Sequence, residues 1–262
     1  MNLLEVKNLT KNFGGLTAVD DVSLHVADQE LVALIGPNGA GKTTIFNLLT
    51  GVNAPSSGTI SLKIDGKLQL LNQQPVSKIA DLGLARTFQN IRLFEQMTVL
   101  DNVMVAMTSK VSENPLSEVL RLPSFYEKET QMKDKAIKLL ELFDLADSVN
   151  QKASNLAYGQ QRRLEIVRAL ATAPKLLFLD EPAAGMNPRE TAELTASIKM
   201  IQEKFKIAVI LIEHDMKLVM ELAQRIYVLE YGRLIAEGQP KEIQNNPEVI
   251  RAYLGGDDLE LF

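Results

Sequence analysis

Cysteine and tryptophan are absent from the 262 residues of the chain, and histidine occurs only twice. Without cysteine the chain can form neither a disulfide nor a thiolate zinc site, and the absence fits a reducing compartment. Two histidines are too few for us to expect a catalytic metal centre built from imidazoles. Thiol chemistry is excluded outright.

Long apolar runs are also missing. The longest, Leu31–Ile35 and Ala208–Ile212, have the size of buried strands and fall far short of the ~18 residues that a membrane-spanning helix needs. The first residues, MNLLEVKNLTKNF, contain no apolar core of a signal peptide. We expect a cytoplasmic protein, which can still dock on a membrane protein.

Positive charge is in short supply. Lys and Arg number 28 against 33 Asp and Glu, so the net charge is −5 at pH 7. The basic footprint of a nucleic-acid-binding protein is therefore missing, and we expect no nucleic-acid partner. The apolar fraction of 46% and the charged fraction of 23% are ordinary for a globular protein.

The chain begins with antiparallel strands mixed with one strand–loop–helix unit. Residues 22–26 alternate apolar and polar side chains, which predicts a half-buried strand, and His25 on its polar side is expected to be simply solvated. The uninterrupted apolar run at 31–35 predicts a strand covered on both faces. Residues 59–64 alternate again and end in Asp65-Gly66, a hairpin-turn sequence.

The middle of the chain is predicted to be helical and the last third α/β. Helical periodicity runs from about 98 to about 173, interrupted by a polar stretch at 109–124 that we expect to be an irregular, exposed insertion. Strands then alternate with helices, which predicts parallel βαβ units with right-handed crossovers. The predicted order is strand 175–180, helix 188–204, strand 207–212, helix 215–223 and strand 225–230.

Residues 36–43, GPNGAGKT, match the pattern G-x4-G-K-[ST]. Glycine supplies unusual backbone angles, so successive N–H groups can point inward at phosphate oxygens. Lys42 would reach the β- and γ-phosphates of a nucleotide, and the Thr43 hydroxyl would ligate Mg²⁺. A buried strand precedes the pattern and a helix follows it, with its positive N-terminus toward the same anion. The predicted nucleotide-binding residues are Gly36, Pro37, Asn38, Gly39, Ala40, Gly41, Lys42, Thr43 and Thr44.

A second apolar strand, residues 175–180, ends in a pair of carboxylates. Its position puts Asp180 at the carboxyl edge of the sheet, where ligands of α/β proteins bind. Asp180 is expected to hold Mg²⁺ through water, and Glu181 to polarise the attacking water.

The sequence Asn155-Leu-Ala-Tyr-Gly-Gln-Gln161 lies upstream of this strand and opens a helix. It resembles the signature motif of the ABC-transporter ATPases, usually Leu-Ser-Gly-Gly-Gln, and the resemblance covers essentially the whole chain. It implies ATP and Mg²⁺ as cofactors and a head-to-tail dimer of two ATPase subunits, the second being a paralogue or another copy. The signature residues of one subunit would cap the γ-phosphate bound by the other; here they are Ala157, Tyr158, Gly159 and Gln160.

Other elements of the family occur in order. The resemblance implies that Phe13 stacks on adenine, that Gln89 senses Mg²⁺ and the transporter, and that His214 contacts the γ-phosphate. Glu181 and His214 would thus be the catalytic residues. Residues 184–187 occupy the place of the D-loop. The segment after Gln89 would contact a membrane permease through Ile91, Arg92, Leu93 and Phe94.

Two positions depart from the family pattern. Ala157 replaces the usual signature serine, so a hydroxyl to the γ-phosphate is absent, although backbone N–H groups can still bind the anion. Asn187 replaces the usual aspartate of the D-loop and removes a charge at the dimer seam. Neither change touches the phosphate loop or the carboxylate pair, so we expect activity.

A narrower resemblance rests on the segments at 86–107, 154–170, 179–191, 212–220 and 245–255. They are similar to the larger ATPase subunit of branched-chain amino-acid importers. ATPase subunits of urea, short-chain amide and lipopolysaccharide transporters share many of these sequence segments, so they stay open as alternatives. A non-transport ABC ATPase would be expected to carry two ATPase domains or long coiled coils, a GTPase would carry an Asn-Lys-x-Asp motif, and a degenerate regulatory subunit would be expected to lack Glu181 or His214.

The expected architecture is α/β: a P-loop NTPase core with an antiparallel β subdomain and a helical subdomain. We expect one ABC ATPase domain over 1–262, with the core and antiparallel part at about 1–95 and 165–246. The helical part is expected at about 96–164 and a C-terminal helix at about 247–254. The protein would sit on the inner face of the cell membrane, bound to permease subunits and without direct contact with the transported substrate.

Overall fold

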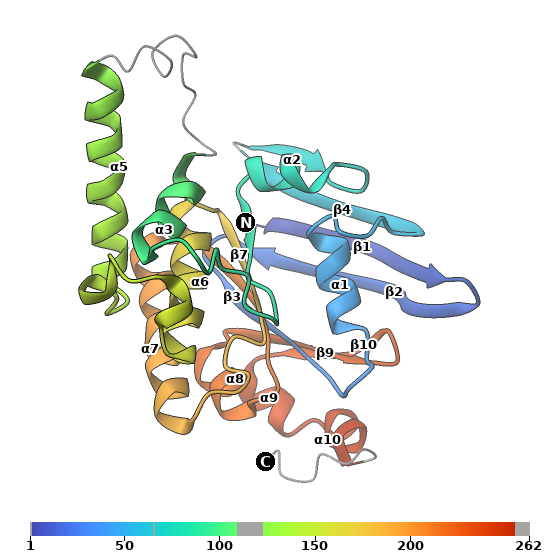
Figure 1. The fold of residues 1–262 in the computed structure, drawn as a ribbon. Helices are drawn as coiled ribbons and strands as arrows, with labels where there is room; N and C mark the ends of the chain where they lie inside the picture. The colour runs from blue at the N-terminus through green and yellow to red at the C-terminus, as the bar shows by residue number, and fades with distance from the viewer. Residues whose placement is uncertain (1, 65, 109–122, 255–262) are drawn as a thin grey trace. The chain divides into compact units, whose positions relative to one another are not determined.

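The computed structural model describes residues 2–64, 66–108 and 123–254 (Figure 1). The chain divides into two compact units, one formed by Met1–Arg86 with Lys175–Phe262 and the other by Thr87–Pro174. Residues 109–122 of the insertion expected at 109–124, and the turn residue Asp65, lie outside the described residues. Among those described, no helix has both the length and the apolar composition needed to cross a membrane.

The first unit is built on a six-stranded sheet in the order β10-β9-β3-β8-β7-β6. From β9 to β6 all neighbours are parallel, and only the edge strand β10 is antiparallel. Three central strands are buried at every residue because helices and the second sheet cover both faces, as their uninterrupted apolar runs predict. The strands are β3 (Leu31–Ile35), β6 (Leu84–Arg86), β7 (Leu176–Asp180), β8 (Ala208–Ile212), β9 (Arg225–Glu230) and β10 (Arg233–Gly238).

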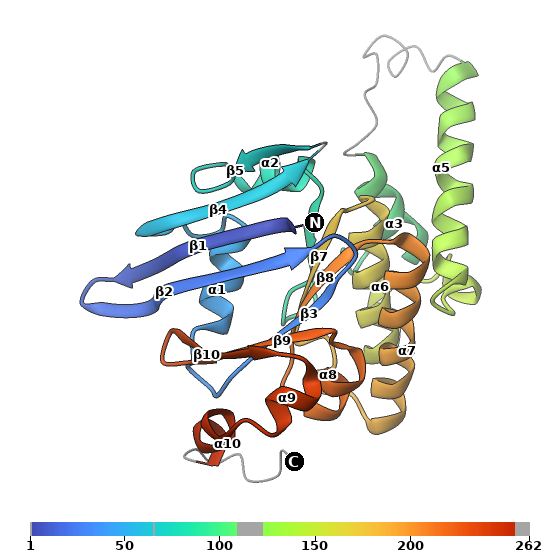
Figure 2. The same ribbon diagram turned by 180° about the vertical axis from the view of Figure 1, so that it is seen from behind.

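A second, antiparallel sheet of the first unit has the order β2-β1-β4-β5. Helix α1 (Lys42–Leu49) lies beside it in both views of Figures 1 and 2. Side chains of α1, of this sheet and of the six-stranded sheet form one apolar core, including Leu4, Phe46 and Phe178. The rings of Phe46 and Phe178 meet edge to face at 5.3 Å. The strands are β1 (Asn2–Phe13), β2 (Leu16–Ala27), β4 (Ser57–Ile64) and β5 (Lys67–Leu70).

Five more helices belong to the first unit, counted over the residues that the structure describes. Figure 2 shows α9 and α10 beside β9 and β10, which they contact. The helices are α2 (Val76–Asp81), α7 (Pro188–Phe205), α8 (Met216–Leu222), α9 (Pro240–Gln244) and α10 (Pro247–Leu254).

The second unit is helical in its described part. Helices α3 (Val99–Thr108), α5 (Pro123–Glu141) and α6 (Tyr158–Ala171) pack on one another around Val103, Leu140 and Leu164. Short 3-10 turns occur at Ala146–Ser148 and Ala153–Asn155. Helix α5 begins at Pro123 and so includes the last two residues of the stretch expected to be irregular, because proline is favoured at the first helical position.

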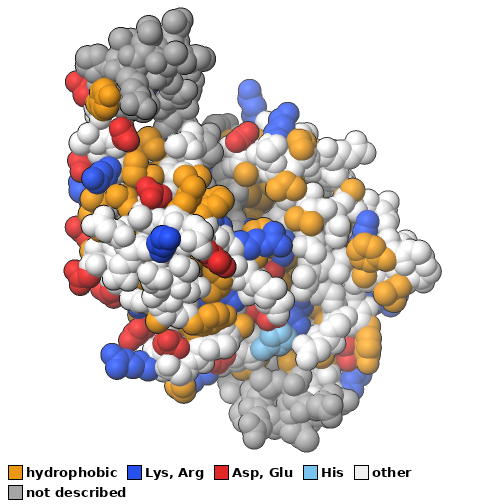
Figure 3. Space-filling view, in the orientation of Figure 1, with side chains coloured by type: hydrophobic (Ala, Val, Ile, Leu, Met, Phe, Trp, Pro, Cys, Tyr) orange, Lys and Arg blue, Asp and Glu red, His pale blue; other side chains and the backbone are white. Residues whose placement is uncertain are grey.

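The boundary between the units follows whole helices. Helix α6 runs without a break from Tyr158 to Ala171 and contacts both α3 and α5, so residues 165–174 group with the helical unit and not with the core. Residues 87–95 group with it as well. The face drawn in Figure 3 carries apolar side chains in small groups separated by charged and polar atoms.

Candidate functional site

The loop between β3 and α1 is the first element of the site. Gly36, Gly39 and Gly41 have φ of 152°, 79° and 102°, which side chains rarely tolerate. A Cβ on Gly41 would stand 2.6 Å from the carbonyl oxygen of Ala18, so this turn also lies too close to β2 for any larger residue. The loop therefore has the tight, glycine-dependent backbone that a phosphate cradle needs.

Lys42 is buried at the first position of α1 and points back into this loop. Its ammonium donates hydrogen bonds to the carbonyl oxygens of Gly36 at 2.5 Å and Pro37 at 2.9 Å. The loop thus holds one cation at its centre, beside a helix N-terminus. This donor set of an ammonium and backbone N–H groups fits a polyphosphate. Thr43 follows on the exposed side of the first turn and Thr44 is half-buried.

Asp180 ends β7 and is buried. One of its oxygens accepts a hydrogen bond of 2.7 Å from the Arg86 guanidinium at the end of β6. Arg86 also donates to the Asn47 amide oxygen at 2.7 Å and to the Thr50 hydroxyl at 3.1 Å. A single arginine therefore ties the carboxylate to the helix that carries Lys42. Asp180 and Thr43 offer oxygen donors of the kind that Mg²⁺ prefers.

Glu181 and His214 come together at the same edge of the sheet. Strands β3, β8 and β7 are adjacent and parallel, so the phosphate loop, His214 and Glu181 all follow carboxyl ends of neighbouring strands. Nε2 of His214 lies 3.0 Å from Oε1 of Glu181. Glu181 has a φ of 46°, and its N–H donates to the Ile212 carbonyl at 2.9 Å. The pair has the geometry of a carboxylate base with a histidine beside it.

Phe13 lies at the end of β1 with 46% of its surface exposed. The Lys11 ammonium sits 4.9 Å from the centre of its ring. An exposed aromatic face of this kind can accept a stacked base.

The signature residues open helix α6 in the second unit. Ala157 is the N-cap and offers no side-chain oxygen to the helix, while its own N–H donates to the Gln160 side chain at 3.2 Å. Tyr158 is exposed, whereas Gly159 is buried. The Tyr158 hydroxyl accepts a hydrogen bond of 3.2 Å from Arg162, one turn further along.

Arg162 joins the signature helix to the segment that holds Gln89. Its guanidinium donates to the carbonyl oxygens of Phe88, at 2.7 Å, and of Gln89. Glu165 lies 3.2 Å from the same guanidinium and accepts from the Phe88 N–H. Burial raises the pKa of the Glu165 carboxyl, and the Phe88 N–H and Arg162 only partly oppose this. Neither Arg162 nor Glu165 was singled out from the sequence.

The segment after Gln89 carries a mixed surface. Gln89 is exposed, Ile91 and Leu93 are half-buried and Phe94 is 47% exposed. Arginines lie over two rings of this segment, Arg92 at 4.1 Å from the Phe88 ring centre and Arg168 at 5.4 Å from that of Phe94. Burial lowers the pKa of Arg168, and the charge of Glu165 opposes this.

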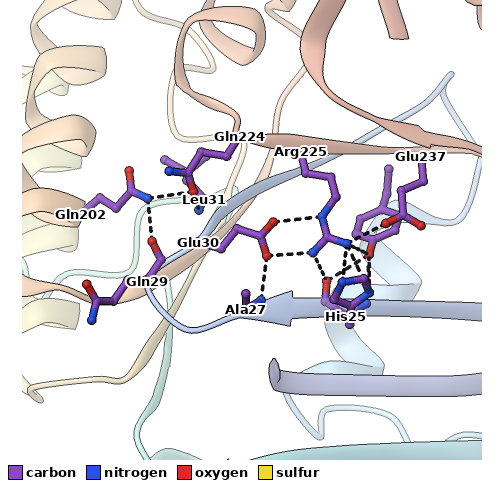
Figure 4. A network of polar contacts seen from close by, with 10 residues as sticks. His25, Ala27, Gln29, Glu30, Leu31, Gln202, Gln224, Arg225 and Glu237 are labelled. Atoms are coloured by element: carbon purple, nitrogen blue, oxygen red, sulfur yellow. Dashed lines mark hydrogen bonds and ion pairs between the residues drawn. The ribbon is translucent and has the colours of Figure 1, made fainter. Parts of the chain in front are cut away.

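His25 is not simply solvated, and the expectation for it was wrong. It is half-buried, and the Arg225 guanidinium lies 2.6 Å from its Nε2 (Figure 4). Arg225 also pairs with Glu30 at 2.8 Å and with Glu237 at 2.6 Å, and bonds the Tyr227 hydroxyl at 2.9 Å. Burial raises the pKa of Tyr227 to about 12. Strands β9 and β10 of the six-stranded sheet lie against this face of β2, which an alternating pattern alone cannot indicate.

Comparison with known protein families finds two matches. A family described as ABC transporter matches residues 19–184, more than half of the chain. A family described as branched-chain amino acid ATP-binding cassette transporter matches residues 233–258.

Relatives are similar over nearly the full length. The high-affinity branched-chain amino acid transport ATP-binding protein LivG of Escherichia coli (strain K12) is 50% identical over 97% of this chain and 98% of its own. The corresponding protein BraF of Pseudomonas aeruginosa is 47% identical over the same shares. A crystal structure of the ADP conformation of an ATP-binding cassette from an ABC transporter aligns with a TM-score of 0.83 at 32% identity. That alignment covers 98% of this chain and all of the other.

Proposed function

Because the chain belongs to the ABC transporter family, we propose that it is the ATP-hydrolysing subunit of a membrane importer for branched-chain amino acids. The family match confirms the resemblance and the α/β P-loop fold that the motifs predict. The single observation that carries the proposal is the edge where three parallel strands end. A glycine loop around Lys42, and Glu181 within 3.0 Å of His214, follow these strands.

The nucleotide is ATP, held by residues 36–44. The loop N–H groups and Lys42 bind its phosphates, and Phe13 stacks on the base. Thr43, Gln89 and Asp180 hold Mg²⁺, Asp180 through water. When bound, the ion neutralises charge on the phosphate oxygens. The Arg86 contact orients the Asp180 carboxylate and supports this assignment.

Hydrolysis relies on Glu181 as the general base and on His214 as its neighbour at the γ-phosphate. Their 3.0 Å contact orients the carboxylate before water is bound. Catalysis is then mostly positioning together with the charge of Lys42.

The active form is a head-to-tail dimer of this chain with a second ATPase subunit, a paralogue or another copy. Ala157, Tyr158, Gly159 and Gln160 act on the ATP of the partner. Both units together form one ABC ATPase domain. The protein is cytoplasmic and binds permease subunits at the inner face of the membrane through Ile91, Arg92, Leu93 and Phe94. It contacts neither nucleic acid nor the transported substrate.

The test of ATP hydrolysis compares the natural chain with Glu181→Gln. The substitution keeps size and removes the base, so ATP binding is expected to be unchanged while phosphate release slows at least ~100-fold. Lys42→Ala tests nucleotide binding instead of hydrolysis, because it should abolish tight ATP binding. Full turnover in Glu181→Gln would contradict the catalytic assignment, and unchanged ATP affinity in Lys42→Ala would contradict the phosphate loop.

The transported substrate is tested in vesicles that contain the whole transporter with its binding protein. ATP hydrolysis is expected to rise when leucine, isoleucine or valine is supplied outside. Stimulation by urea or a short-chain amide instead, with no response to leucine, would assign the subunit to a related importer.

A further inference from the structure

Glu213 is a buried carboxylate that the roles above do not use. It lies between the end of β8 and His214, and only 4% of its surface is exposed. Its Oε1 accepts a hydrogen bond of 2.7 Å from the Ala183 N–H, and its Oε2 accepts one of 3.1 Å from the His214 N–H. The Asp215 N–H also bonds the carboxylate. Burial raises the pKa of Glu213, and these N–H groups only partly oppose that.

These contacts join two loops that carry different catalytic groups. Ala183 belongs to a tight turn in which the Ala184 N–H donates to the Glu181 carbonyl at 3.1 Å and the Met186 N–H to the Ala183 carbonyl at 3.0 Å. The turn is fixed to β8 by the Glu181 N–H at its start and, two residues on, by Glu213. Without Glu213 only the first of these two anchors is left.

We propose that Glu213 is a positioning residue for ATP hydrolysis, which clamps the turn at 181–186 to the loop of His214. The inference rests on the proposed function. One carboxylate holds the backbone of His214 with one oxygen and the backbone two residues after Glu181 with the other. The 3.0 Å contact between the Glu181 and His214 side chains then depends on this clamp. Residues 184–187 follow Ala183 directly, so Glu213 also fixes the backbone at the start of this segment.

The chemistry of the site requires two acceptors. A glutamine at 213 has only one acceptor oxygen. Its NH2 group is a donor and would face a backbone N–H that is also a donor. One of the two anchored N–H groups would then be buried without an acceptor, which costs about 1–3 kcal/mol. The turn can relieve this only by moving away, which displaces Glu181 from His214.

The experiment compares Glu213→Gln with Glu30→Gln in the full-length chain. Glu30 is a matched control in the same unit, since it also accepts a backbone N–H, that of Ala27 at 2.7 Å, and it pairs with Arg225 (Figure 4). Both variants lose a structural contact, but only Glu213 joins the catalytic loops. Thermal unfolding is measured for both, so that turnover is compared in folded protein.

For Glu213→Gln we expect kcat for ATP to fall about 10- to 100-fold, the scale of a small misplacement of reacting groups. The KM for ATP is expected to stay within about twofold, because Lys42 and its loop are untouched. In hydrogen exchange, the amides of 181–187 and 213–215 should exchange faster than in the natural chain. Glu30→Gln should leave kcat and these amides unchanged.

Natural turnover together with natural exchange in Glu213→Gln would overturn the inference. An equal loss of kcat in Glu30→Gln at equal stability would overturn it as well, since the effect would then be general destabilisation. If the natural chain hydrolyses no ATP even together with its second ATPase subunit, the proposed function fails. Exchange at 181–187 still reports on the clamp in that case, so the two failures are distinguishable.

Discussion

The buried carboxylates of Glu165 and Glu213 lie in different units and have different partners. Glu165 in the second unit faces the guanidinium of Arg162, at 3.2 Å. Glu213 in the first unit is held by backbone N–H groups of Ala183, His214 and Asp215. Burial raises the pKa of both. Glu165 therefore combines a side-chain cation with the backbone N–H of Phe88, whereas the partners of Glu213 are backbone N–H groups of two loops.

The difference determines what each carboxylate can fix. Glu165 and Arg162 are side chains on one helix and can be replaced together, although each also bonds the backbone of Phe88. The contacts of Glu213 exist only while two loops keep their conformation. We therefore expect the pair in the second unit to dominate stability, and Glu213 to dominate the geometry of catalysis.

The largest expected effect is that of Arg162→Met. The substitution leaves Glu165 buried without its cation, and removing one member of a buried pair costs about 3–5 kcal/mol. It also takes the donor away from the carbonyl oxygens of Phe88 and Gln89. The free energy of unfolding in urea is the measurement, made at neutral pH.

Two controls sharpen this prediction. Arg189→Met breaks an ion pair of similar length, 3.1 Å from Glu193, but Arg189 is 87% exposed, so the loss should be less than about 1 kcal/mol. The double variant Arg162→Met with Glu165→Gln should recover part of the loss, because no charge is left buried. Equal losses of unfolding free energy in Arg189→Met and Arg162→Met would contradict the prediction that the buried pair matters more for stability.

A smaller effect is expected from pH. Because the pKa of Glu165 is raised in the folded protein, the folded state keeps its proton at a higher pH than the unfolded state, whose pKa is near 4.5. The stability that protonated Glu165 contributes is fully present below its pKa in the unfolded chain. It is lost as the pH rises through its pKa in the folded protein. Relative to Glu165→Gln, the natural chain should therefore become less stable over that window. Urea unfolding at a series of pH values measures the difference.

The same titration distinguishes the two carboxylates. Arg162→Met removes an influence that lowers the pKa of Glu165, so its window should extend to higher pH. Comparison of the natural chain with Glu213→Gln gives the pH range over which Glu213 affects stability. That range should be the same when Arg162 is replaced. A window for Glu213 that shifts together with that of Glu165 would contradict their independence.

Sequence patterns predicted the parts of the fold that rest on local order. Strands β3, β7 and β8 are predicted by their apolar runs, and Glu181 and His214 follow the carboxyl ends of β7 and β8. Strand β10 was not predicted, because it is an edge strand whose burial does not alternate. Strand β1 was missed too, since its pairing with β2 shifts register four times.

The long-range polar pairs could not be predicted from the sequence. Arg86 meets Asp180 across 94 residues, and Arg225 meets His25 across 200. A charged residue in a strand or a loop carries no local signal of the partner it will find at such a separation. Arg162 and Glu165 lie about one turn apart on a helix, but an exposed ion pair has the same sequence spacing as a buried one.

The starts of two helices extend the comparison of the units. Asn187 caps α7 in the first unit, and its side-chain oxygen accepts from the N–H groups of Arg189 and Glu190, both at 3.0 Å. The residue that departs from the family pattern is thus an effective N-cap. Asn187→Ala is expected to cost about 1 kcal/mol of unfolding free energy. Thermal or urea unfolding measures this, and Asn187→Asp should keep the cap and most of the stability.

The smallest expected effect is a gain at the other helix start. Ala157 is the N-cap of α6, with φ −60° and ψ 154°, and has no side-chain oxygen for the first N–H groups of the helix. Ala157→Ser keeps this extended backbone and supplies a hydroxyl, so it should add about 0.5–1 kcal/mol, the lower range for restoring such a cap. The Gln160 side chain already accepts the Ala157 N–H at 3.2 Å, so the serine would complete a reciprocal capping box. Ala157→Gly is the matched control, since it changes the backbone entropy but adds no acceptor. A serine variant no more stable than the glycine variant in urea unfolding would show that the start of α6 is held by its packing and by Gln160 and gains nothing from a cap.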